Sequence, residues 1–357
     1  MGFSVFRTIN TPINKFADNL GKTIVKLNKI ASNELKSDSV VFNFSKATPE
    51  DLKRLTSKSM KDTYKRVTWT NPEDGKVYHI LKEGRSKEGI NVKILDRDGA
   101  FVKNATLQPK KIVVFDQFRS LRGKLTHGEL VETFVKRFNP FADVERLHHK
   151  QNVLEMVRYR GVLPQKLQTK KMQKLYEKMQ EGKQVDYISI SETAMADIGN
   201  FANMHPGECQ KQFLAAGVEN VEDYKPLIRT YRKMMDKGTK IFMAAGNSKE
   251  KGAVNSFLAI DGIEGVGALE HNGKVAMDSA SKNSSFTRSY EKRSYYPQLV
   301  KDNNGKILGL NITGRPGAEL PYNYKTNGLK NKIGGTSYAT PVRVAKLSLN
   351  DMMQGVL

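Results

Sequence analysis

Gly335-Thr336-Ser337-Tyr338-Ala339-Thr340-Pro341 is a run of small and hydroxylated residues close to the C-terminus. The pair Gly334-Gly335 allows a tight turn and lets another molecule approach the backbone closely. We expect a helix to begin here, with Ser337 at its N-terminus and Pro341 inside its first turn, where a missing N–H is harmless. Unpaired N–H groups and the helix dipole favour negative charge at this end. A serine whose attack on a carbonyl creates an oxyanion needs that environment, so the run predicts a nucleophile.

The heptapeptide resembles the Gly-Thr-Ser-x-Ala-x-Pro signature of the subtilisin-like serine proteases, or subtilases. That family has its functional residues in the chain order Asp, His, Asn and Ser, and segments similar to each lie upstream of Ser337 in that order. The resemblance covers the chain from about Lys111 to the C-terminus. It implies a serine endopeptidase that acts on protein or peptide substrates.

Two segments are similar to the family's Asp and His regions. Lys111-Ile112-Val113-Val114-Phe115-Asp116 is apolar and β-branched, so we expect a buried parallel strand that ends at Asp116. Thr126 and Glu129 have capping-box spacing, which predicts a helix that begins at or beside His127. Alone, Asp116 is more typical of a turn and His127 of a cap or surface position. Their place in the series favours catalytic roles for both.

Two further strands resemble the walls of the family's substrate pocket. One ends near Ser191, and the other ends in Ala-Ala-Gly-Asn, whose Asn247 is the candidate oxyanion-hole amide. The candidate substrate-contacting residues are Ser189, Ser191, Glu192, Thr193, Ala244, Ala245 and Gly246. Glu192 stands where the family tends to have leucine, which suggests a preference for basic or small substrate side chains.

The resemblance implies a three-layer α/β fold, with a mostly parallel central sheet and helices on both faces. It also implies that Ser337 attacks a peptide carbonyl, that His127 transfers the proton and that Asp116 orients His127, through an acyl-enzyme without a metal or organic cofactor. Gln117-Phe118 follow Asp116 where the family usually has a small residue and glycine. This departure motivates the alternative of a catalytically weak or inactive subtilase-fold protein that binds peptides or a partner.

The N-terminal third lies outside the resemblance. At 357 residues and 38% hydrophobic residues, the chain can form one large α/β domain and an extra segment. We place the boundary so that 1–108 form a small α+β segment and 109–357 the peptidase domain. Residues 14–31 have a weakly amphipathic helical pattern, and 92–102 predict a β-hairpin around Asp98-Gly99. A prosegment, a targeting segment and a partner-binding domain all remain open.

The composition limits the partners. The formal net charge of +22 would suit nucleic acid, but Lys and Arg are spread along the chain, so we expect no specific nucleic-acid binding and leave an acidic partner or surface open. No apolar run reaches membrane-spanning length. The N-terminus lacks a secretory signal, so we expect a cytoplasmic protein or leaderless export. Cys209 is the single cysteine, which excludes an internal disulfide, and we find no carboxylate cluster for calcium.

Overall fold

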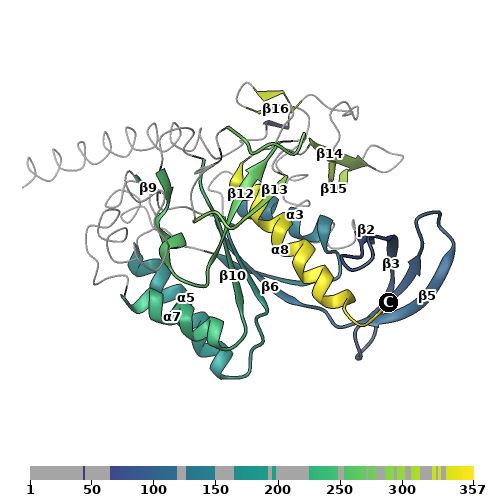
Figure 1. Cartoon of the computed structure of the whole chain (residues 1–357), viewed down its shortest axis with the longest axis horizontal. Coiled ribbons are helices and arrows are strands. Elements are labelled where there is room, and N and C mark those ends of the chain that lie inside the picture. The colour runs from purple at the N-terminus through teal and green to yellow at the C-terminus, as the bar shows by residue number, and fades with distance from the viewer. Residues whose placement is uncertain are drawn as a thin grey trace, which may run out of the picture.

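The computed structural model describes residues 65–118, 126–148, 165–191, 225–247, 253–270, 272–277, 279, 286–292 and 335–357. It also describes the backbone of the short strands β1 (Asn43–Phe44), β9 (Met195–Asp197), β14 (Tyr296–Lys301), β15 (Ile307–Thr313), β16 (Tyr324–Thr326) and β17 (Leu329–Lys330). Figure 1 gives the arrangement of all these elements. The predicted helical pattern at 14–31 lies outside the described residues, as do Glu192, Thr193 and Cys209.

A six-stranded parallel sheet forms the centre of the molecule (Figure 1). Its strand order is β13-β12-β10-β8-β6-β7, and every neighbouring pair is parallel. The strands are β6 (Lys111–Asp116), β7 (Asp143–His148), β8 (Tyr187–Ile190), β10 (Lys240–Ala244), β12 (Glu264–Leu269) and β13 (Ser289–Lys292). The α/β class and the parallel central sheet are therefore confirmed.

Helices cover both faces of this sheet. Helices α3 (His127–Phe138) and α8 (Thr336–Met353) lie on one face, and α5 (Gln165–Gln180) and α7 (Lys225–Asp236) lie on the other. Alternate residues of a strand point to opposite faces. Along β6, Ile112 and Val114 accordingly pack against α3 and α8, whereas Val113 and Phe115 pack against α5 and α7. The three-layer arrangement follows from this alternation.

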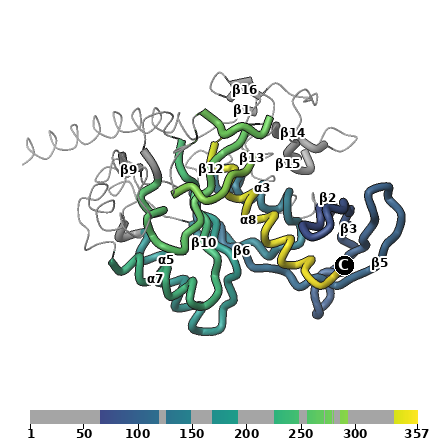
Figure 2. Tube along the Cα trace, in the orientation of Figure 1, coloured from purple at the N-terminus to yellow at the C-terminus, as the bar shows by residue number. Residues whose placement is uncertain are grey.

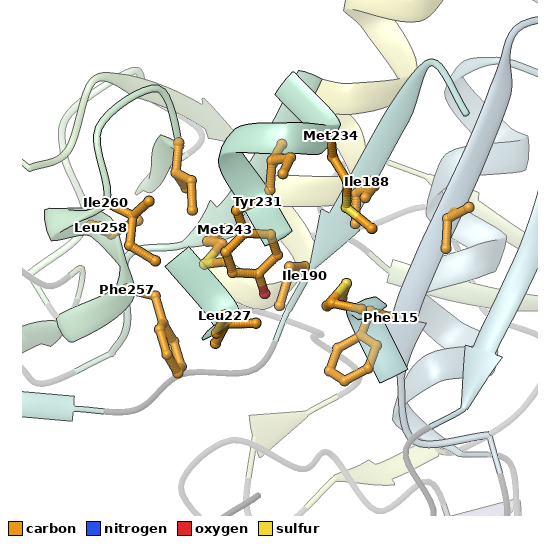
Figure 3. Packing of buried hydrophobic residues seen from close by; sticks show 14 of the residues in the cluster. Phe115, Ile188, Ile190, Leu227, Tyr231, Met234, Met243, Phe257, Leu258 and Ile260 are labelled. Atoms are coloured by element: carbon orange, nitrogen blue, oxygen red, sulfur yellow. The ribbon is translucent and has the colours of Figure 1, made fainter. Parts of the chain in front are cut away.

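The core on the α5 and α7 side is well filled. Tyr231 and Met234 of α7 are fully buried, and Figure 3 shows them beside Ile188 and Met243 of the sheet. The short helix η4 (Ser256–Ala259), which follows β11 (Ala253–Asn255), closes the same core. None of the helices within the described residues has the length and apolar character needed to cross a membrane.

A second sheet, of four antiparallel strands, precedes the central one. Its strands are β2 (Arg66–Thr70), β3 (Val77–Arg85), β4 (Ile90–Leu95) and β5 (Phe101–Leu107), in that order. The predicted hairpin is the β4–β5 pair. Gly99 has a positive φ of 92°, and the Asp96 side chain accepts hydrogen bonds from the Asp98 and Ala100 N–H groups, which together shape the turn.

The four-stranded sheet shares a hydrophobic core with the C-terminal part of α8. Trp69, Ile80 and Ile94 pack with Leu349 and Met352 of that helix, and the Trp69 Nε1–H donates to Asn350 Oδ1 over 2.7 Å. Figure 2 shows the end of α8 beside these strands. The predicted boundary at residue 108 remains a prediction, but the two sides of it are joined by buried contacts.

An ion pair also links the two sheets. Both Nη atoms of Arg85 on β3 donate to the Asp143 carboxylate on β7, over 2.8 Å each. This pairing lowers the pKa of Asp143 below its ordinary value. Because both side chains are about half exposed, the pair fixes orientation more than it stabilises the fold.

The shared core predicts cooperative unfolding. Ile94→Ala removes a fully buried side chain, and we expect it to lower the free energy of unfolding by roughly 2–5 kcal/mol. The loss of stability should appear as a shift of a single unfolding transition of the whole chain, measured by circular dichroism. Both sheets should become more sensitive to trypsin together. Val102→Ala, at an exposed position of the same hairpin, is the control and should change little. Two separate unfolding transitions, of which Ile94→Ala shifts only the one at lower denaturant or temperature, would contradict the shared core.

Candidate active site

The carboxylate of Asp116 and the imidazole of His127 meet at the carboxyl edge of the central sheet. The His127 Nδ1 atom lies 2.9 Å from each Asp116 carboxylate oxygen. Asp116 is 1% exposed, and its Oδ1 also accepts the Gln117 N–H over 2.6 Å. With Nδ1 bonded to a carboxylate, the neutral imidazole carries its proton there and leaves Nε2 as the base.

The first turn of α3 holds His127 in place. Thr126 is the N-cap residue, and the predicted capping box forms: its Oγ1 accepts the Glu129 N–H while the Glu129 carboxylate accepts the Thr126 N–H. The Gly128 N–H donates to the Gln117 carbonyl over 3.0 Å. A Cβ atom at Gly128 would lie 2.7 Å from that same oxygen, so the close approach of helix and strand end requires glycine.

Ser337 lies in the first turn of α8. Gly335, the N-cap residue, has a φ of 135°, which L side chains rarely adopt, and the helix begins at Thr336. Ser337 is 4% exposed, and its Oγ atom makes no hydrogen bond to a described residue. The next side chain, Tyr338, packs its ring against the His127 ring with centroids 5.2 Å apart. The structure therefore brings Asp116, His127 and the Ser337 turn together.

The position expected for Pro341 was wrong. Because α8 begins at Thr336, Pro341 is the sixth residue of the helix and lies past its first turn. Proline has no N–H, so the carbonyl four residues earlier, that of Ser337, loses its helical donor. The Ser191 hydroxyl donates to this carbonyl over 2.9 Å. Ser191, predicted to contact substrate, thus holds the backbone of the candidate nucleophile.

The Asn247 amide is oriented by Thr336. Asn247 Oδ1 accepts the Thr336 N–H over 2.9 Å and the Thr336 hydroxyl over 3.2 Å, and the same hydroxyl accepts the Gly246 N–H. A Cβ on Gly335 would lie 3.2 Å from Asn247 Nδ2 and 3.6 Å from Ser337 Oγ, so the amide and the hydroxyl both lie next to this glycine. The role of Thr336 was not predicted. The only signal for it in the sequence is its place between Gly335 and Ser337 in the Gly-Thr-Ser motif.

The remaining predicted wall residues that the structure describes are buried at the ends of β8 and β10. Ser189, Ala244 and Ala245 have no exposed surface, and the Ser189 hydroxyl makes no hydrogen bond to a described residue. Asn255, which was not predicted as a site residue, donates from its side chain to the Ala244 carbonyl and from its backbone to the Ala245 carbonyl. No sequence pattern marks Asn255, because its partners are the last residue of β10 and the residue after it. In the described part of the chain, no group of three His, Cys, Asp or Glu side chains is arranged to hold a metal ion.

Comparisons with known proteins give a distant likeness. No protein-family model matches the sequence, and no curated protein matches it. Among solved structures, the self-cleaved protease domain of PatA has a TM-score of 0.43 and 14% identity, covering 69% of this chain and 80% of that one. Prenylagaramide maturation protease PagA has a TM-score of 0.42 and 14% identity, covering 70% of this chain and 78% of that one. Sphericase has a TM-score of 0.38 and 15% identity, covering 71% of this chain and 82% of that one.

Removal of the Ser191 hydroxyl should disturb Ser337. Ser191→Ala leaves the buried Ser337 carbonyl without a donor, and we expect a loss of about 1–3 kcal/mol in the free energy of unfolding. Ser191→Thr keeps a hydroxyl and serves as the matched control. The measurement is chemical denaturation of both variants. If Ser191→Ala were as stable as the wild type, the Ser191 hydroxyl would not be needed as a donor to the Ser337 carbonyl in place of the N–H that Pro341 lacks.

Proposed function

We propose that the protein is a serine endopeptidase that hydrolyses peptide bonds through an acyl-enzyme. The observation that carries this proposal is the pairing of His127 with the buried Asp116 carboxylate, beside a serine in the first turn of a helix. In the proposed cycle, His127 Nε2 takes the Ser337 proton as Oγ attacks the peptide carbonyl, and then gives that proton to the leaving amine. Water, deprotonated by the same imidazole, then attacks the acyl carbonyl, and the imidazolium returns this proton to Ser337 Oγ as the ester C–O bond breaks. Asp116 keeps the imidazole in the reactive tautomer and stabilises its cation.

The oxyanion of the tetrahedral intermediate would be bound by two donors. One is the Asn247 side-chain amide, whose orientation is set by the two hydrogen bonds that its oxygen accepts from Thr336. The other is the Ser337 backbone N–H, one of the first-turn N–H groups that have no acceptor within a helix. Together with the helix dipole, these donors are suited to a developing negative charge. We propose that the substrate backbone lies at the carboxyl edge of the sheet, where β8 and β10 end beside Ser191 and Asn247.

A second candidate function is peptide or partner binding without turnover. The observation that favours it is that Ser337 Oγ makes no hydrogen bond to a described residue, so the bond from His127 to the nucleophile is not formed in this conformation. Catalytic hydrogen bonds often form only when substrate binds, so this conformation is compatible with an active enzyme.

A fluorophosphonate probe separates the two functions, because it reacts covalently only with an activated serine. We expect the wild-type protein to be labelled and to cleave an unfolded protein substrate such as casein. Ser337→Ala and His127→Ala should abolish both signals. Asn247→Ala should keep the serine and lower turnover by roughly 10²–10³, the usual effect of removing one oxyanion-hole donor from a serine protease.

Controls make a negative result interpretable. Each variant must show the wild-type circular dichroism spectrum and melting temperature before its activity is compared. A folded wild-type protein that is neither labelled nor proteolytic, yet binds peptides, would overturn the endopeptidase and leave the binding function. Labelling that persists in Ser337→Ala would show that a different residue is the nucleophile.

A further inference from the structure

We propose that Arg146 is a positioning residue for the Asp116–His127 pair; this proposal rests on the function proposed above. Arg146 lies on β7, the edge strand beside β6, and its backbone is in register with Val114. Val114 faces the α3 side of the sheet, so Arg146 points to the same side. From there its guanidinium reaches both segments that carry the pair.

The first contact of Arg146 is with helix α3. Its Nε donates to Glu132 Oε2 over 2.7 Å, and its Nη1 lies 3.9 Å from Glu129 Oε1. Glu129 is the capping-box residue two positions after His127, and its other carboxylate oxygen accepts the Thr126 N–H over 2.8 Å. The Arg146 guanidinium therefore lies beside the carboxylate that closes the first turn of the helix bearing His127.

The second contact is with the segment after Asp116. The Arg146 guanidinium lies over the Phe118 ring, 5.3 Å from its centroid, within cation–π range. The Phe118 N–H donates to His148 Nδ1 over 3.1 Å, and the Gln117 carbonyl accepts the Gly128 N–H. Residues 117–118 are thus fixed between β7 and α3. The Phe118 ring thereby supplies a surface for the guanidinium.

The burial of the two carboxylates makes Arg146 hard to replace. The Glu129 and Glu132 side chains are only 7% and 5% exposed, and burial raises the pKa of Glu129. Lys136 also pairs with Glu132, one turn along α3. Lys136 thus supplies a positive charge to Glu132, whereas the contacts to Glu129 and Phe118 belong to Arg146. A positioning role therefore predicts a larger effect for the loss of Arg146 than for the loss of Lys136, whereas simple neutralisation of Glu132 predicts similar effects for both.

The test compares Arg146→Gln with Lys136→Gln. Each substitution removes one positively charged partner of the Glu132 carboxylate. The first readout is the rate of fluorophosphonate labelling of Ser337 as a function of pH. We expect Arg146→Gln to lower this rate by about 10- to 100-fold, the scale of a small misplacement of catalytic groups, and Lys136→Gln to change it less than about threefold. Arg146→Lys keeps the charge but not the planar fork, so it should restore the rate only in part.

The second readout needs no activity. The proton shared by His127 Nδ1 and Asp116 is followed by low-field ¹H NMR, with the signal assigned by its loss in Asp116→Asn. We expect Arg146→Gln to shift or broaden this signal and Lys136→Gln to leave it in place. If the wild type is unlabelled but the signal still responds to Arg146→Gln, the proposed function fails and the positioning role stands.

Phe118→Leu keeps the proposal testable if Arg146→Gln does not fold. It removes the ring surface under the guanidinium without unpairing a buried charge, and we expect it to shift the same NMR signal and to slow labelling. A folded Arg146→Gln with an unchanged NMR signal would overturn the proposal, whatever its melting temperature. If Arg146→Gln is unfolded, an unchanged signal in Phe118→Leu would overturn it.

Discussion

The hydrogen bond between His127 Nδ1 and the buried carboxylate of Asp116 depends on how closely the end of β6 approaches the start of α3. A charged carboxylate at 1% exposure is costly unless hydrogen-bond donors surround it. The imidazole and the Gln117 N–H supply those donors, and Gly128 permits the approach. The alternating side chains of β6 then bury both faces of the strand, so the position of Asp116 is determined by the whole three-layer core.

Helix α8 connects this site to the rest of the molecule. Its first turn is tied to the two strand ends of the site, through Ser191 after β8 and Asn247 after β10. Its last turns pack against the four-stranded sheet through Leu349 and Met352. The helix has 18 residues, and at about 1.5 Å per residue it spans roughly 27 Å. The N-terminal sheet therefore supports the end of α8 that is remote from Ser337.

Local patterns predicted most of the elements that carry the site. The apolar run before Asp116 and the Thr126–Glu129 spacing predicted the strand and the capped helix, because both depend on residues close together in the sequence. The start of α8 was predicted at the correct turn, but Pro341 was placed about one turn too early in the helix. Glycine at Gly335 allows the helix to begin immediately, and no local rule fixes that register.

The parts that could not be predicted depend on contacts between distant segments. The hydroxyl of Ser191 replaces a helical donor for a carbonyl 146 positions further along the chain, and Trp69 bonds a residue 281 positions away. The two contacts of Arg146 likewise join β7 to α3 and to Phe118. Each of these side chains has an ordinary local sequence, and only the order of strands in the sheet brings it to its partner.

The most direct measurement is a crystal structure of the protein after reaction with a peptidyl phosphonate, a mimic of the tetrahedral intermediate. We predict a covalent bond from phosphorus to Ser337 Oγ. We also predict a phosphonate oxygen within about 2.7–3.1 Å of both Asn247 Nδ2 and the Ser337 N–H nitrogen, with His127 Nε2 facing the adduct. An unmodified Ser337, or an adduct whose oxygen points away from Asn247, would contradict the proposed mechanism.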